Sequence, residues 1–86
     1  MKKILKFWAP WCGPCKMYAP IFEKVVKKYE DQLEFINVNV DEDTSGLAAE
    51  HKVRNIPFTV LIREDGSSIS KSGLLSEQEL EELILS

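Results

Sequence analysis

The chain has 86 residues, of which 44% are hydrophobic and 29% are charged, and its formal net charge is −3. This length and composition predict a single domain, residues 1–86, that folds around one compact core. Charges of both signs are interspersed, which argues against a nucleic-acid binder, because such a protein needs a basic face. No apolar run reaches the length of a membrane span, so we expect no membrane insertion.

The amino terminus begins like the basic region of a secretory signal, with the sequence MKKILK. Lys6 and Pro10 then break the apolar stretch, and no small-residue cleavage site follows. We therefore expect a cytoplasmic protein. In that compartment a lone pair of cysteines is more typical of catalysis or metal binding than of a structural disulfide.

The first third of the chain predicts a strand followed by a long helix. Residues 4–9 are apolar at nearly every position except Lys6, which is typical of a strand buried on both faces. We expect the helix to begin near Pro14, a favourable first-turn residue, and to be kinked but not ended by Pro20. One apolar stripe at intervals of three and four residues is formed by Cys15, Tyr18, Phe22, Val25, Val26 and Tyr29.

The middle of the chain predicts a second strand and a short helix. Residues 34–40 alternate in a way that places Ile36 and Val38 on one face. Asp43 or Thr44 is expected to cap a short helix that ends at about residue 51.

The last third predicts a hairpin and a final helix. Residues 58–62 are rich in β-branched and aromatic side chains, and the Asp65-Gly66 turn is expected to join them to a strand at 67–72. Ser76 and Glu79 have the spacing of a capping box at the start of a helix.

The predicted order is therefore β-α-β-α-β-β-α. A strand–helix–strand unit of this length normally makes a right-handed crossover between parallel strands, and the hairpin adds an antiparallel pair. We expect an α/β fold in which three helices flank a four-stranded mixed sheet. The functional site is expected at the carboxyl end of the first strand.

The only two cysteines lie in Trp11-Cys12-Gly13-Pro14-Cys15, where the first strand ends and the long helix begins. Cys12 stands before the helix, where unpaired N–H groups and the positive end of the helix dipole favour a thiolate. Cys15 lies one turn inside, on the apolar stripe. We therefore expect Cys12 to be exposed and acidified, and Cys15 to be shielded.

This asymmetry suits a two-step exchange between disulfides. Cys12 attacks a substrate disulfide to form a mixed disulfide, and Cys15 then attacks Cys12 and expels the reduced substrate. Trp11 and Pro14 are expected to flank Cys12 with flat apolar surface, which suits a peptide partner.

Other interpretations of the cysteine pair remain open at this point. A structural zinc site needs four ligands, so the two cysteines and His51 would require a carboxylate as the fourth. Haem attachment needs a histidine after the second cysteine, and Lys16 stands there instead. The pair could also be inert and buried. We expect no metal and take His51 to be an ordinary residue near a helix end.

The segment FWAPWCGPCKM, residues 7–17, closely resembles the active-site segment of the thioredoxin family. The resemblance covers nearly the whole chain and implies the thioredoxin-like fold. It is carried further by Ala19-Pro20, Asn39-Val40-Asp41, Arg54-Asn55-Ile56-Pro57, Gly73 and Leu75-Ser76.

This resemblance implies that Cys12 and Cys15 are the catalytic residues and form a redox disulfide. It also implies that Pro57 is cis and packs beside the dithiol, with the backbone of Ile56 offering strand-like hydrogen bonds to a substrate. The expected substrate-binding residues are Trp11, Gly13, Pro14, Ile56 and Pro57. The implied partners are disulfide-containing proteins and a thioredoxin reductase, or a related flavin- or ferredoxin-linked enzyme. A monomer without a cofactor is expected.

The chain departs from the family pattern in three respects. It begins at the strand leading to the site, as a minimal version close to glutaredoxins in size, and Phe58 stands where a threonine is usual. Lys6 occupies the position of the family's buried aspartate, and Asn37 that of its partner lysine.

Two hypotheses follow for Lys6. Its ammonium can reach water along a covered stem with little effect on the site. Alternatively the amine lies near the dithiol and acts as a pKa modulator. A charged amine there stabilises thiolate and makes the couple more oxidising, whereas a neutral amine could accept the proton of Cys15.

The predicted function is reduction of protein disulfides by dithiol exchange. The short chain keeps a glutathione-dependent, glutaredoxin-like enzyme as an alternative, although WCGPC and the lack of an obvious charged glutathione site argue against it. A second alternative is a binding subunit that uses the thioredoxin surface without redox chemistry.

Overall fold

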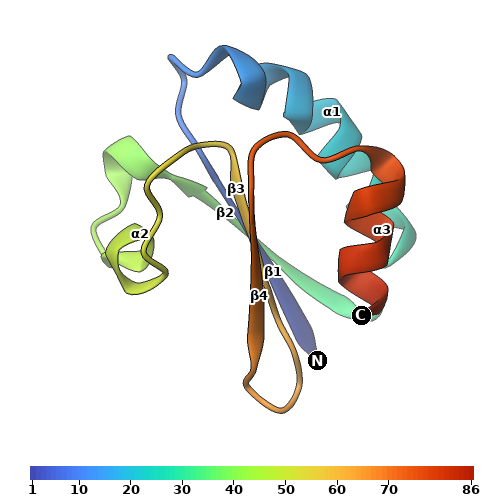
Figure 1. Ribbon diagram of the computed structural model, residues 1–86. Helices are drawn as coiled ribbons and strands as arrows, with labels where there is room; N and C mark the ends of the chain where they lie inside the picture. The colour runs from blue at the N-terminus through green and yellow to red at the C-terminus, as the bar shows by residue number, and fades with distance from the viewer.

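The computed structural model describes all residues, 1–86, and contains four strands and three α-helices (Figure 1). The elements are β1 (Lys2–Trp8), α1 (Gly13–Lys28), β2 (Leu33–Asn39), the 3₁₀ helix η1 (Val40–Glu42), α2 (Leu47–Glu50), β3 (Phe58–Ile62), β4 (Ser68–Ser72) and α3 (Glu77–Leu85). The predicted order of strands and α-helices is confirmed, and η1 is an addition to it. No helix has the length and apolarity needed to cross a membrane.

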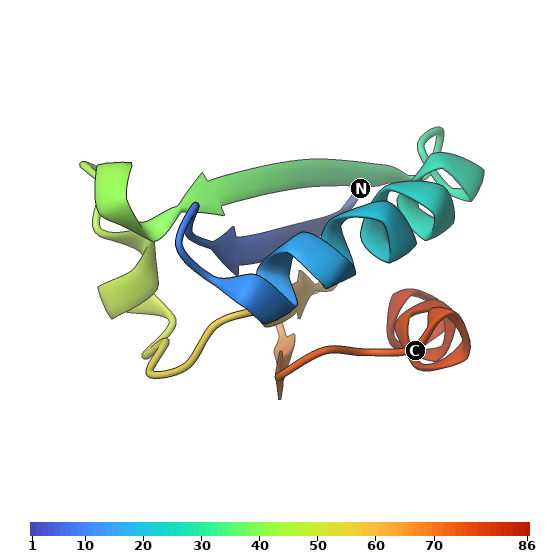
Figure 2. The ribbon, with the colours of Figure 1, turned by 90° about the horizontal axis from the view of Figure 1, so that it is seen from above.

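The strands form one mixed sheet in the order β2-β1-β3-β4. β1 and β2 are parallel because α1 crosses over between them, and both pairs involving β3 are antiparallel. β1 begins two residues earlier than predicted, at Lys2, and ends one residue earlier, at Trp8. Figure 2 shows β1 and β2 ending at one edge of the sheet, where α1 begins and where η1 and α2 also lie.

α1 and α3 cover one face of the sheet, and α2 lies on the other (Figure 1). The predicted stripe of α1 is buried in this layer, apart from Tyr29, which is partly buried after the helix end. α1 continues through Pro20, as expected. The main core cluster between α1, α3 and the sheet contains Ile4, Tyr18, Phe22, Val25, Val26, Leu33, Leu61, Leu75, Leu80, Leu83 and Ile84.

One hydrogen bond inside this layer pairs two fully buried hydroxyl groups. The Tyr18 hydroxyl and Thr59 Oγ1 lie 2.8 Å apart, between α1 and β3. Burial raises the pKa of Tyr18 to about 12, because the phenolate is poorly solvated in the core, while the hydrogen bond from Thr59 acts in the opposite direction. The pair leaves neither hydroxyl without a partner.

The short helix α2 begins later than predicted. Gly46 adopts a left-handed φ of 73° as its N-cap, which interrupts any helix starting at Asp43 or Thr44. The carboxylate of Asp43 still caps the helix, because it accepts the N–H groups of Leu47 at 3.0 Å and Ala48 at 2.7 Å. The predicted capping residue was therefore right, and the predicted starting point was wrong.

The start of α3 confirms the capping box. Glu79 N–H donates to Ser76 Oγ at 3.1 Å, and Ser76 N–H donates to Glu79 Oε1 at 3.0 Å. Hydrogen bonding of the Ser76 backbone and side chain to the Glu79 carboxylate holds the pKa of Glu79 below its usual value. Lys24 and Lys28 of α1 pair with glutamates of α3 at 3.3 and 3.1 Å, which aligns the two helices.

Candidate active site

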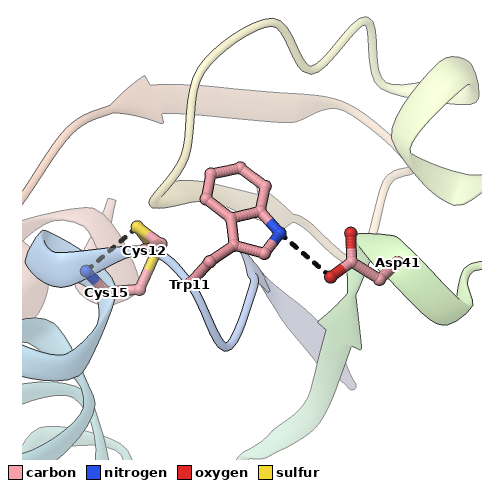
Figure 3. Close-up of a disulfide and its surroundings, with 4 residues drawn as sticks. All are labelled: Trp11, Cys12, Cys15 and Asp41. Carbon is pink, nitrogen blue, oxygen red and sulfur yellow. Dashed lines mark hydrogen bonds between the residues drawn. A yellow bond between two sulfur atoms is a disulfide. The ribbon is translucent and has the colours of Figure 1, made fainter.

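Cys12 is the N-cap residue of α1. Its backbone is extended, and its Sγ accepts the N–H of Cys15 at 3.2 Å (Figure 3). Pro14 stands in the first turn, where a residue without an N–H loses no helical hydrogen bond. The sulfur of Cys12 therefore lies at the positive end of a helix of 16 residues.

Cys12 and Cys15 form a disulfide with their Cα atoms 5.2 Å apart. Both residues are buried, with 5% of Cys12 and 4% of Cys15 exposed. The prediction that Cys15 is buried is confirmed, and the prediction that Cys12 is exposed is wrong for this disulfide form. The two cysteines cluster with Ala9 at the start of the helix, and Ile56 packs against them.

Trp11 is 69% exposed beside the disulfide. Its indole Nε1 donates to Asp41 Oδ2 at 3.0 Å (Figure 3). The Asp41 N–H in turn donates to Asn39 Oδ1 at 3.0 Å. The exposed ring is thus anchored to the segment that follows β2. Our sequence reasoning gave Asp41 no role. The signal was available, because β1 and β2 are parallel and the residues following them share one edge.

Ile56 and Pro57 approach the disulfide from the segment before β3. The peptide bond between them is cis, as predicted, and Pro57 is fully buried. Ile56 is partly buried and packs on the cluster formed by Ala9, Cys12 and Cys15. Gly13 and Pro14 are exposed, and a Cβ at Gly13 would meet nothing within 4 Å. The surface at the start of α1 is therefore open.

Lys6 lies in the middle of β1, opposite Asn37 of β2 and Thr59 of β3. Only 5% of the residue is exposed, and its Nζ lies 5.1 Å from the ring centroid of Phe22 and 6.0 Å from that of Phe35. The stem of Lys6 is therefore covered, as predicted. Burial lowers the pKa of Lys6, and the Glu23 carboxylate acts in the opposite direction.

A cavity of about 340 Å³ lies between the start of α1 and the sheet. Lys6 and Cys15 both line it. The other lining residues are Trp8, Ala9, Pro10, Lys16, Ala19, Glu23 and Asn37. The indole Nε1 of Trp8 is the one buried side-chain nitrogen or oxygen without a hydrogen-bond partner.

His51 ends α2, away from the cysteine cluster. Its ring lies 6.0 Å from that of Phe7 in the layer on the α2 face, and its Nε2 lies 3.4 Å from Glu50 Oε2. No group of three or more His, Cys, Asp or Glu side chains is placed to hold a metal ion.

The fold, with the Cys12–Cys15 disulfide at the edge where β1 ends, places this chain in the thioredoxin-fold class. The oxidized form of mitochondrial thioredoxin 3 from Saccharomyces cerevisiae matches 98% of this chain, and 76% of its own, with a TM-score of 0.82 and 36% identity. The family model for thioredoxin matches residues 1–86. The chain belongs to the thioredoxin family.

Two bacterial relatives carry the same family name. Thioredoxin 1 of Synechococcus elongatus is 42% identical over 66 residues, which are 77% of this chain and 60% of that protein. The thioredoxin of Borreliella burgdorferi is 40% identical over 81 residues, which are 94% of this chain and 68% of that protein. The chain thus spans about two thirds of the length of these relatives.

Proposed function

We propose that this protein is a cytoplasmic thiol–disulfide oxidoreductase that reduces protein disulfides through Cys12 and Cys15. The observation that carries the proposal is the position of Cys12 as N-cap, with its sulfur accepting the N–H of Cys15. When the disulfide is reduced, this N–H and the helix dipole stabilise a thiolate on Cys12. We expect the pKa of Cys12 to lie below the usual thiol value of about 8.5.

The proposed cycle balances in two steps. The Cys12 thiolate attacks one sulfur of the substrate disulfide, and the other sulfur leaves as a thiolate that takes up a proton. Cys15 then loses its proton and attacks Cys12 Sγ, which breaks the mixed disulfide and releases the second substrate thiol. The substrate gains two electrons and two protons, and the protein ends in the disulfide form described above.

The substrate is proposed to bind as an extended peptide. Trp11 offers an exposed apolar ring beside Cys12, and Gly13 and Pro14 leave the surface open. Neither the N–H nor the C=O of Ile56 is hydrogen-bonded within the chain, although its side chain packs on the cysteine cluster. An extended peptide can pair with these groups as an added strand, next to Pro57.

Each turnover leaves a disulfide that must be reduced again. We propose that a thioredoxin reductase, or a related flavin- or ferredoxin-linked enzyme, supplies the electrons. The protein itself needs no bound cofactor, because both sulfurs that exchange electrons belong to the chain. We propose that it works as a monomer, with residues 1–86 as one domain.

The proposal is tested by following reduction of the disulfides of insulin, with NADPH and thioredoxin reductase as the electron source. We expect wild-type protein to reduce insulin and Cys15→Ser to accumulate a mixed disulfide instead. Reduction that proceeds with glutathione alone would favour the glutaredoxin-like alternative. A biological role that survives replacement of both cysteines by serine would favour a binding subunit.

A further inference from the structure

Lys6 has a covered stem, and its ammonium has no carboxylate or hydrogen-bond partner within the chain. Only 5% of the residue is exposed, and none of the four ion pairs involves it. Burying a charge without a partner is unfavourable, so most buried lysines are paired. The chain therefore retains at this position a group that stability alone does not favour.

Two aromatic rings lie beside the amine of Lys6. Nζ lies 5.1 Å from the ring centroid of Phe22 and 6.0 Å from that of Phe35, within the range of cation–π attraction. The rings come from α1 and β2, so they hold the ammonium between the helix and the sheet. Both rings and Glu23 favour the ammonium, whereas burial favours the neutral amine and lowers the pKa of Lys6.

The cavity of about 340 Å³ connects this ammonium to the dithiol, since Lys6 and Cys15 both line it. The charged groups that face it from α1 are Lys16 and Glu23, while β1 adds Trp8 and β2 adds Asn37, which carry no charge. Glu23 lies eight residues beyond Cys15, about 12 Å along the helix at about 1.5 Å per residue. The cavity thus holds two cations and one carboxylate, and Phe22, beside which the ammonium of Lys6 lies, is seven residues beyond Cys15.

We propose that Lys6 is a positioning residue of the redox site, whose ammonium acts through this cavity to stabilise the ionised dithiol of Cys12 and Cys15. The inference rests on the proposed thiol–disulfide exchange and adds the direction in which Lys6 shifts the reduction potential. A cation that favours thiolate favours the reduced form, so Lys6 makes the couple more oxidising than a neutral side chain would.

The effect depends on pH in a way that a structural role does not. The two thiols titrate as a coupled pair, and the ammonium stabilises only their ionised forms. At pH 5 both thiols are protonated, so the charge of Lys6 has little to act on. At pH 9 thiolate is present, and the effect appears in proportion to the fraction of Lys6 that is protonated, which burial reduces by lowering the pKa of Lys6.

The test equilibrates the protein with glutathione, in which the Cys12–Cys15 disulfide and two glutathione thiols give the protein dithiol and one glutathione disulfide. Lys6→Met keeps the length and removes the charge. We expect it to shift this equilibrium at least threefold toward the protein disulfide at pH 9, about 15 mV at about 30 mV per tenfold, and less than about 1.5-fold at pH 5. Lys6→Arg should stay within about twofold of wild type at both pH values.

Two further variants keep the test decisive. Lys3→Met removes a half-exposed lysine of the same strand and should match wild type. Glu23→Gln removes an exposed carboxylate that faces the cavity, and should shift the equilibrium toward the dithiol at pH 9, opposite to Lys6→Met.

Equal values for wild type, Lys6→Met and Glu23→Gln at pH 9 would overturn the inference, as would a Lys6→Met shift of the same size at both pH values. If Lys6→Met does not fold, the sign of the Glu23→Gln shift decides. Normal exchange in wild type, with no effect of these variants, would leave the proposed function standing. Failure of wild type to exchange at all would overturn both.

Discussion

The layer between α1, α3 and the sheet differs from the edge at which β1 ends in how its polar groups are paired. In the layer, the hydroxyls of Tyr18 and Thr59 bond each other, and the rest of the cluster is apolar. At the edge, Ile56 has free backbone groups and Trp8 Nε1 has no partner, and Lys6, in the middle of β1, has no counterion in the cavity behind this edge. Paired groups hold the fold, while unpaired groups remain available to a substrate or a thiolate.

This contrast predicts that changes in the layer lower stability without altering redox chemistry. Changes at the edge should alter redox chemistry without lowering stability. The largest effect is expected for Cys12→Ser. Because the attacking sulfur is lost, insulin reduction should fall ~1,000-fold or more. Its denaturation midpoint should stay near that of the reduced wild type. A large loss of stability would show that the edge also holds the fold.

Leu80→Ala tests the opposite side of the contrast. Leu80 is fully buried on α3, and its truncation should lower the free energy of unfolding by about 2–5 kcal/mol. Urea denaturation measures the loss. The glutathione equilibrium of the folded variant should equal that of wild type, and a shift in it would break the separation between the two regions.

Tyr18→Phe removes one half of the hydroxyl pair. Thr59 is then left without its partner in the core, so we expect a loss of about 1–2 kcal/mol at pH 7. Urea denaturation of both proteins gives this difference, and an unchanged stability would mean that the hydrogen bond does not contribute.

The same variant carries a pH dependence. The pKa of Tyr18 is raised to about 12 in the folded protein, whereas an unfolded tyrosine ionises near pH 10. The unfolded chain therefore releases this proton first, and wild type should lose stability as the pH rises from about 10 to about 12. Tyr18→Phe should lack this part of the loss, so its deficit relative to wild type should shrink at pH 11.5.

The smallest effect is expected for Asp41→Ala. The hydrogen bond from Trp11 is exposed, so its loss should change stability by less than about 1 kcal/mol. Without this bond the Trp11 ring is no longer held in one position on the substrate-binding surface. We expect this to lower kcat/KM for insulin by about two- to fivefold. Trp11→Ala serves as the control, and adding Asp41→Ala to it should have no further effect on kcat/KM.

Local signals in the sequence were sufficient for most of the fold. The capping box of Ser76 and Glu79, the stripe on α1 and the β-branched run of β3 were all confirmed, because each depends on residues close in the chain. The start of α2 was missed because Gly46 takes a left-handed conformation, which competes with a helix starting at Asp43.

The site was less predictable where it depends on tertiary contacts. Trp11 and Asp41 are 30 residues apart, and Phe22 and Phe35 meet over Lys6 from different elements. Cys12 is buried in the disulfide form against Ala9 and Ile56, contacts that no spacing in the sequence specifies. The CxxC spacing could predict that two sulfurs meet, but not how they are covered.

The most direct test of the account is the order in which the two thiols of the reduced protein react with iodoacetamide at pH 7. Mass mapping of the alkylated peptides after short times gives the rate at each cysteine. We predict that Cys12 reacts at least about tenfold faster than Cys15, because only its sulfur lies at the helix N-terminus and becomes free when the disulfide opens. Equal rates at the two positions, or faster reaction of Cys15, would contradict the proposed division of roles.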